Sequence, residues 1–261
     1  MERSRKRNRR ASQDNLEGVD MKGANNTPVT RKVKTDMAAK ANKKPLVALN
    51  DKQQEYLNSL NDPNIATIIA MGVLGSSKTF LPSALAADKL MDGTLERVVV
   101  ARPAEGRAKS VGFTKGDFDQ KLAGWCAPIL DTMKQRMGLG NFEAALEYGK
   151  IVLLPLEQVK GRSWDDTWVI ADEVEDIESE TAKSLVTRMG QRSKIILAGD
   201  IAQQDLKRYS GLQYLLDVAK TLDLPIKIVD FNDWKYCVRS EEAKLWGMAF
   251  EQYEKMGHSK S

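Results

Sequence analysis

The chain alternates short apolar runs with segments of helical periodicity, and this alternation constrains its fold more than any other feature. The runs are rich in β-branched residues, as buried parallel strands are, and most end in a polar residue or glycine. Alternating strands and helices predict βαβ units, and therefore an α/β fold with a mostly parallel sheet between helices, in three layers. The predicted strands cover residues 66–71, 97–102, 150–156, 167–172, 194–200 and 226–231, and the predicted helices cover 51–61, 77–91, 117–137, 141–148, 178–189, 210–222 and 240–256.

The composition excludes several kinds of site. His258, near the C-terminus, is the only histidine in the 261 residues. The rest of the chain therefore has no histidine to act as the base in Ser-His-Asp or Cys-His catalysis, or as a ligand in a Cys/His zinc site. Cys126 and Cys237 form no CxxC pair, which favours reduced thiols and a cytoplasmic protein. No apolar run approaches the roughly 20 residues of a membrane span, and no apolar segment of the kind found in signal peptides follows the charged N-terminus. Catalysis is therefore expected to use carboxylates, Lys, Arg, hydroxyls and backbone amides.

Residues 1–46 differ in composition from the rest of the chain. They contain 13 Lys or Arg and 5 Asp or Glu residues, no aromatic residue and no apolar periodicity. Such a segment buries too little apolar surface to offset its ordering entropy, so we expect a disordered basic arm followed by a globular domain over residues 47–261. The arm either contacts nucleic acid or another acidic partner, or serves only as a solubilising tail.

The segment 72–79, GVLGSSKT, follows a predicted strand and opens a predicted helix. Its spacing is that of a phosphate-binding P-loop, G-x-x-x-x-G-K-[ST], except that Ser77 stands where the pattern has glycine. In such a loop the backbone amides bind phosphate, Lys78 reaches the β- and γ-phosphates, and the Thr79 hydroxyl holds Mg²⁺. The residues expected around the phosphates are Gly72, Gly75, Ser76, Ser77, Lys78 and Thr79.

The sequence leaves the effect of Ser77 open. Serine costs little there if the residue is already helical, but about 1 kcal/mol or more if the backbone needs a positive φ. A strand–turn–helix corner without any ligand is the alternative interpretation of the whole segment.

Two further predicted strands end in side chains suited to phosphoryl transfer. Asp172 and Glu173 follow strand 167–172 in the manner of a Walker B strand, in which one carboxylate supports Mg²⁺ and the next orients or deprotonates the attacking water. Asp200 and Gln203 follow strand 194–200 and are suited to sense the γ-phosphate. Carboxyl ends of parallel strands share one edge of the sheet, where ligands bind. The alternative for Asp172 and Glu173 is an exposed acidic turn, because EVEDIESE continues with more acid.

Taken together, these segments resemble the PhoH-like P-loop ATPases, whose core is similar to the first domain of superfamily 1 helicases. The resemblance runs from about Leu46 to Tyr253. In this sequence Val73 and Leu74 stand where the family has Pro-Ala, and Glu175 stands where it has glutamine. The segments that carry the resemblance are LNDKQ (49–53), GVLGSSKT (72–79), ARPAEG (101–106), VGFTKGD (111–117), KGRSWDD (160–166), ADEVED (171–176), LVTRMG (185–190), AGDIAQQDL (198–206), YSGL (209–212) and CVRS (237–240).

The resemblance implies a protein that binds ATP and hydrolyses it with Mg²⁺, in which Gln53 reads the adenine base. It also points to RNA or single-stranded nucleic acid as a partner, and to a homo-oligomer, with a hexamer as one arrangement. In such an assembly an arginine stabilises charge in a neighbouring site, and each candidate is equally consistent with a structural salt bridge. The candidates are Arg188, Arg162 and, after them, Arg208.

Two rival functions remain open at the level of sequence. The P-loop could serve as a scaffold that binds nucleotide without turnover and acts through protein contacts. A packaging-type motor subunit is the second rival, and the RPAEG and GFTKGD segments argue against it. Trp164, Trp168 and Trp234 are as consistent with core packing as with stacking on bases. A divergent core with a basic arm is also common in phage-encoded proteins, for which the compartment is the host cytoplasm.

Overall fold

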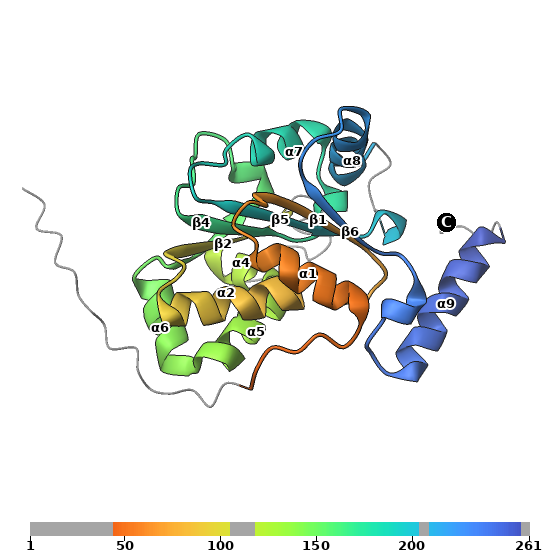
Figure 1. Ribbon diagram of the computed structural model, residues 1–261, viewed down its shortest axis with the longest axis horizontal. Coiled ribbons are helices and arrows are strands. Elements are labelled where there is room, and N and C mark those ends of the chain that lie inside the picture. Colours follow the sequence, from red (N-terminus) through yellow and green to blue (C-terminus); the bar gives the residue numbers. More distant parts are fainter. Residues whose placement is uncertain (1–43, 105–117, 204–208, 257–261) are drawn as a thin grey trace, which may run out of the picture. The chain divides into compact units, whose positions relative to one another are not determined.

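The centre of the protein is a six-stranded sheet with the order β3-β2-β4-β5-β1-β6, and every neighbouring pair of strands is parallel (Figure 1). The computed structural model describes residues 44–104, 118–203 and 209–256, which fall in one compact unit. The strands are β1 (Thr67–Gly72), β2 (Arg97–Arg102), β3 (Ile151–Pro155), β4 (Thr167–Ala171), β5 (Lys194–Gly199) and β6 (Lys227–Phe231). The predicted parallel α/β sheet is confirmed. Residues 1–43 of the predicted arm (1–46) lie outside the described residues, so its disorder stays a prediction.

Helices cover both faces of this sheet, as the alternation in the sequence predicts (Figure 1). The first face carries α1 (Asp51–Asn61), α2 (Phe80–Asp92), α4 (Phe118–Trp125), α5 (Ala127–Met137) and α6 (Leu139–Glu147). The second face carries α7 (Ser179–Val186) and α8 (Gly211–Thr221), and α9 (Glu241–Lys255) follows β6. Short 3-10 turns lie at Leu156–Gln158, Val174–Asp176, Ile201–Gln203 and Trp234–Tyr236.

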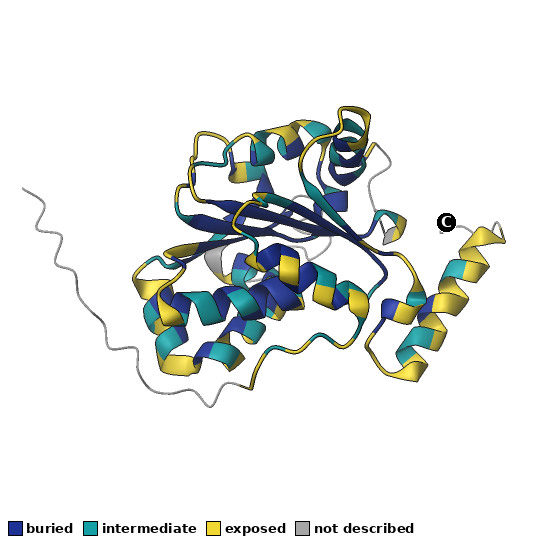
Figure 2. Cartoon of the chain, viewed as in Figure 1, coloured by how far each residue is buried: buried dark blue, intermediate teal, exposed yellow. Residues whose placement is uncertain are grey.

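Alternation of side chains along the strands builds two separate cores. In β1, Ile68 and Ala70 pack with the α1, α2 and α5 layer, whereas Ile69 and Met71 pack with the α7 and α8 layer. Side chains of a strand point alternately to the two faces of a sheet, and both faces are covered here, so the strands are apolar throughout. Figure 2 shows the central strands as the most deeply buried part of the chain.

Several predicted helix bounds differ from the structure, among them the end of the helix predicted over 178–189, which ends at Val186, and two of the differences have a clear local reason. The predicted helix 117–137 is broken between α4 and α5 at Cys126, because Pro128 has no N–H to donate to the preceding turn. The helix predicted to begin at Ser77 begins at Phe80, because Ser77 has a φ of 75° and is not helical.

The tryptophans are mainly structural. Trp164 and Trp168 are only 4% and 7% exposed, so the interpretation as core residues is confirmed for both. Trp234 is half-buried and its ring lies over Gly247 of α9. Within the part of the chain that the structure describes, no helix has the length and apolar character needed to cross a membrane.

A buried lysine holds the end of α1 against the sheet. The Nζ of Lys194 in β5 donates to the carbonyl oxygens of Ser59, Asp62 and Ile65, at 3.1, 2.8 and 2.5 Å. The last carbonyls of a helix have no partner within the helix, so the ammonium group completes them. Burial lowers the pKa of Lys194 to about 8. The contact fixes α1, which carries side chains into the site described below.

Replacing Lys194 by methionine keeps the apolar stem and removes the ammonium group, so the carbonyls of Ser59, Asp62 and Ile65 each lose its hydrogen bond. We expect Lys194→Met to lower the free energy of unfolding by about 2 kcal/mol, measured by urea denaturation. Lys220→Met, at an exposed position of α8, is the control and is expected to have almost no effect. Equal stability of the two variants would contradict this role for Lys194.

Candidate functional site

The loop after β1 crosses the carboxyl end of the sheet in a conformation that its glycines permit. Gly72 has a φ of 133°, and a Cβ there would lie 2.2 Å from the carbonyl carbon of Phe231 at the end of β6. The next residue, Val73, donates its N–H to the Phe231 carbonyl oxygen at 3.2 Å. Gly75 has a φ of 70°, and a Cβ there would lie 2.7 Å from Cγ of Arg239. The loop is therefore packed on both sides by backbone and side chains that follow β6.

Ser77 takes the costly conformation of the two that the sequence left open. Its φ of 75° lies in the left-handed region, where a non-glycine residue is strained by about 1 kcal/mol or more. Its hydroxyl accepts a hydrogen bond from Nε2 of Gln53 at 3.2 Å. A glycine at this position has no group to receive that bond, so the serine joins the loop to α1 in a way that the usual residue does not.

The loop ends in two residues with clear partners. Lys78 donates from Nζ to the carbonyl oxygens of Gly72 and of Val73, the latter at 2.9 Å, and burial lowers its pKa. The carbonyl of Lys78 accepts from the hydroxyl of Tyr56 at 3.0 Å. Thr79 donates from Oγ1 to Oδ1 of Asp172 at 2.7 Å, across a separation of 93 residues in the chain. The predicted juxtaposition of loop threonine and Walker B carboxylate is thus present.

The two carboxylates after β4 face an arginine from β2. Asp172 is 8% exposed, so the alternative of an exposed acidic turn is wrong for this residue. Burial raises the pKa of Asp172, while Arg102 and the hydrogen bond from Thr79 oppose the rise. Nε of Arg102 lies 3.3 Å from Oδ2 of Asp172, and its Nη2 pairs with Oε1 of Glu173. Glu173 has a left-handed backbone, with φ 58° and ψ 44°, a strain that is common at functional sites.

A cavity of about 390 Å³ is lined by residues 75–80 of the loop and by Arg102, Asp172, Val238 and Arg239 among others, whereas Glu173, which pairs with Arg102, is not part of its lining. The Thr79 hydroxyl and the Asp172 carboxylate are hard oxygen donors, which fit Mg²⁺. No group of three or more His, Cys, Asp or Glu side chains suited to a metal occurs among the described residues. Mg²⁺ at a nucleotide site takes only one or two ligands from the protein, because phosphate oxygens and water supply the others, so Thr79 and Asp172 are sufficient.

Asp200 follows β5, which lies between β1 and β4 in the sheet. It is 7% exposed, and its Oδ1 accepts from the N–H of Ala202 at 3.0 Å. Burial lowers the pKa of Lys78, and the negative charge of Asp200 opposes that fall. The side chain of Gln203 lies outside the described residues.

Gln53 lies at the loop but is engaged by the chain itself. Its Oε1 accepts from the N–H of Leu49 at 2.8 Å, and its Nε2 donates to Ser77 and, at 3.5 Å, approaches the Ser76 carbonyl. The side chain is 1% exposed. Its contact with adenine stays a prediction.

Two of the arginines predicted to act on a neighbouring subunit, Arg162 and Arg188, do not line the cavity. Arg162 is exposed in the loop before β4, and Arg188 is half-buried after α7. The two segments meet where the N–H of Trp164 donates to the Arg188 carbonyl at 3.2 Å. Arg208 and the segment 111–117 lie outside the described residues. Action on a second subunit stays a prediction for each arginine.

Three residues at the site carried no predicted role: Tyr56, Arg102 and Arg239. The last two stand in segments that the resemblance singled out, ARPAEG and CVRS. Only the fold brings them to the loop, because β2 and the segment after β6 are far from it in sequence. For Tyr56 the sequence indicated only that it lies in a helix, not that it lies at the site.

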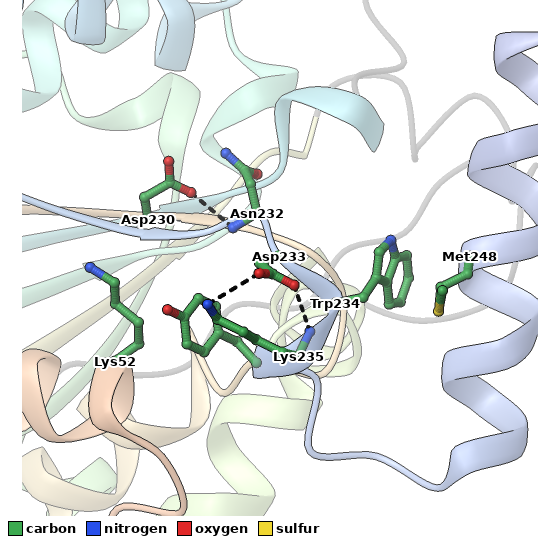
Figure 3. A pocket seen from close by; sticks show the side chains of 8 residues that line it. Lys52, Asp230, Asn232, Asp233, Trp234, Lys235 and Met248 are labelled. Carbon is green, nitrogen blue, oxygen red and sulfur yellow. Dashed lines mark hydrogen bonds and ion pairs between the residues drawn. The ribbon is translucent and has the colours of Figure 1, made fainter.

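Another hollow, of about 740 Å³, lies between α1, the end of β6 and α9 (Figure 3). Its lining includes Asp230 and Asp233 together with Lys52 and Lys235. Nζ of Lys235 pairs with Oδ2 of Asp233 at 3.2 Å. Its two lysines only balance its two aspartates and it has no phosphate loop, so the cavity at the loop is the better candidate for a nucleotide.

A parallel sheet with a phosphate loop after β1, whose threonine bonds to the carboxylate after β4, defines a P-loop NTPase core. The family model described as PhoH-like protein matches residues 45–251, and the chain belongs to this family. The resemblance found in the sequence is therefore confirmed.

Three relatives show the extent of the similarity. Protein PhoH of Escherichia coli (strain K12) is 32% identical over 200 residues, which cover 75% of this chain and 55% of that protein. The PhoH-like protein of Bacillus subtilis (strain 168) is 31% identical over 173 residues, covering 66% and 54%. That of Synechocystis sp. (strain ATCC 27184 / PCC 6803 / Kazusa) is 32% identical over 174 residues, covering 66% and 52%. The matched region spans about half the length of these relatives.

The bond between Gln53 and Ser77 predicts an energetic coupling. Ser77→Ala keeps the backbone strain and loses the bond, so we expect it to cost about 1 kcal/mol of unfolding free energy. In a Gln53→Ala background the same change is expected to cost almost nothing. A double-mutant cycle measured by urea denaturation gives the coupling directly. Additive effects of the two substitutions would contradict the bond.

Glu175 predicts a dependence of stability on pH. The residue is 5% exposed, its Oε2 has no hydrogen-bond partner among the described residues, and burial raises its pKa from an ordinary 4.5 to about 8. The folded protein therefore keeps a proton that the unfolded chain releases, and this group makes the protein less stable as pH rises from about 4.5 to 8.

Glu175→Gln removes that titration. We expect its gain in unfolding free energy over the wild type to be larger at pH 8 than at pH 5, by about 1 kcal/mol or more, because a pKa difference of one corresponds to about 1.4 kcal/mol. Glu180→Gln, at an exposed position, is the control. The same gain at both pH values would show that Glu175 is ionised in the folded protein.

Proposed function

We propose that this chain binds ATP with Mg²⁺ in the loop cavity and hydrolyses it, with residues 47–261 as the ATPase domain. The observation that carries the proposal is the 2.7 Å hydrogen bond from Thr79 to Asp172. It joins the end of the phosphate loop to the Walker B carboxylate, and both groups are oxygen donors of the kind Mg²⁺ takes. Membership of the PhoH-like family supports a P-loop ATPase-type protein.

The loop supplies the phosphate contacts in this proposal. Backbone N–H groups of residues 72–79 and the start of α2 stabilise the negative phosphate chain. Lys78 exchanges its bonds to the Gly72 and Val73 carbonyls for phosphate oxygens. Thr79 and Asp172 would hold Mg²⁺, which would supply positive charge against the phosphates. Tyr56, bonded to the Lys78 carbonyl, keeps the loop backbone in place.

Glu173 orients the attacking water and accepts its proton. For that role its carboxylate must leave Arg102, with which it pairs in this structure. Arg102 lines the same cavity, so a phosphate oxygen can replace Glu173 as its partner. Asp200 and Gln203, which follow β5, sense the γ-phosphate from the neighbouring strand end.

A second candidate function is a scaffold that binds nucleotide without turnover. The pairing of Arg102 with Glu173 favours it, because a carboxylate held by an arginine is a weak base. In that case nucleotide binding would change the contacts of the protein with a partner rather than drive a reaction.

Coupling to RNA or single-stranded nucleic acid, and assembly into a homo-oligomer, also remain proposals. The support for nucleic acid is the basic composition of residues 1–46. An oligomer would allow Arg188 or Arg162 to reach a second site. Coupling to nucleic acid is tested by measuring ATP turnover with and without single-stranded RNA. Assembly is tested by measuring the mass of the protein in solution.

The decisive experiment follows phosphate release from Mg-ATP for the wild type, Lys78→Ala and Glu173→Gln, with and without single-stranded RNA. We expect both variants to lose at least about 100-fold in turnover, while Glu173→Gln still binds ATP. ATP binding without turnover in the wild type would support the scaffold. No binding of ATP under either condition would contradict both functions.

A further inference from the structure

Arg239 lies beyond the end of β6, yet its side chain runs along the phosphate loop. Its Cγ and Cδ are 2.7 and 3.0 Å from the place that a Cβ would take on Gly75. It lines the same cavity as Lys78, Thr79 and Asp172. The stem of this arginine is thus packed on the loop itself, far in sequence from the residues that the P-loop pattern identifies.

The backbone on both sides of Arg239 is fixed. Val238 donates its N–H to the Gly75 carbonyl at 3.0 Å, which ties the segment directly to the loop. Before it, the ring of Tyr236 packs edge-on against Phe231, with centroids 6.1 Å apart. After it, Ser240 caps α9 by accepting from the N–H of Ala243 at 3.3 Å. A side chain carried on a segment held at both ends is well placed to bind a ligand.

The charge of Arg239 is not used by the protein where the structure describes it. Arg102 pairs with Asp172 and Glu173, and Lys78 bonds to loop carbonyls. No carboxylate pairs with Arg239 over residues 44–104, 118–203 and 209–256. An exposed guanidinium beside the N–H groups of a phosphate loop is complementary to phosphate oxygens, which it can bind through two parallel hydrogen bonds.

We propose that Arg239 binds the phosphate chain of the nucleotide from within the same chain, as a further cation beside Lys78 and Arg102. The inference rests on the proposed function of the loop and adds a residue to it. Arg102 must first leave Glu173 to reach a phosphate, whereas Arg239 lines the same cavity with no carboxylate partner among the described residues. Arg162 and Arg188 lie outside the cavity. Arg239 also links the phosphates to the start of α9 through Ser240.

The test compares ATP affinity in the presence of Mg²⁺ for the wild type, Arg239→Met and Arg239→Lys. Methionine keeps an apolar stem against Gly75 and removes the charge. We expect Arg239→Met to bind ATP about 10-fold or more weakly, Arg239→Lys to recover part of that loss, and all three proteins to unfold at the same temperature. Arg97→Met, at an exposed arginine that begins β2, is the matched control and is expected to bind as the wild type does.

Two results would overturn the inference alone. The first is that Arg239→Met binds ATP with the affinity of the wild type. The second is that Arg239→Met binds ATP more weakly, Arg239→Lys recovers none of the lost affinity, and the unfolding temperature falls. That second result would show that the residue acts through packing. In both cases Lys78→Ala would still weaken ATP binding. If the wild type bound no ATP, or if Lys78→Ala bound it normally, the proposed function itself would fall, and the inference with it.

Discussion

The rest of the site depends on the close approach between the phosphate loop and the end of β6. Gly72 lies so near the Phe231 backbone that no side chain fits between them, and Val73 is bonded to the Phe231 carbonyl. This contact turns the chain out of β1 and directs the following residues over the sheet edge. Because the turn begins there, the side chain of Thr79 reaches Asp172 and that of Lys78 folds back onto the carbonyls of Gly72 and Val73. The parallel pairing of β6 with β1 therefore shapes the site as well as the fold.

Apart from Lys194 at the start of β5, the buried charged side chains of the described residues gather at this edge of the sheet. Asp172, Glu175 and Asp200 are each less than a tenth exposed; their charges act on the pKa of Lys78, and Asp172 pairs with Arg102. Removing several charges from water is costly unless they are paired and hydrogen bonded, so a structural core would not gather them. The raised pKa values of Asp172 and Glu175, both caused mainly by burial, reflect that cost. Such a cluster is what a ligand that brings its own charge would use.

The sequence predicted the sheet well because its strands are short, apolar and bounded by turn residues, a pattern that depends on local chemistry alone. It also predicted the partnership of Thr79 with Asp172, since the P-loop and Walker B patterns each imply the other. It could not decide the conformation of Ser77, because a positive φ there is imposed by the packing of the loop. Arg102 and Arg239 were missed as site residues for a related reason. Their positions depend on which strands are neighbours, and strand order is a property of the whole fold.

The contact between Gly75 and Arg239 has a consequence for how this site can vary. Ser77 shows that a left-handed backbone in this loop tolerates a side chain, so the φ of 70° does not by itself require glycine at position 75. What excludes a side chain there is the stem of Arg239. The choice of residue at one position therefore sterically limits the choice at the other. A protein with a smaller residue at position 239 would have room for a small side chain at position 75. A protein that keeps the arginine could accept a side chain at position 75 only if the arginine took another conformation.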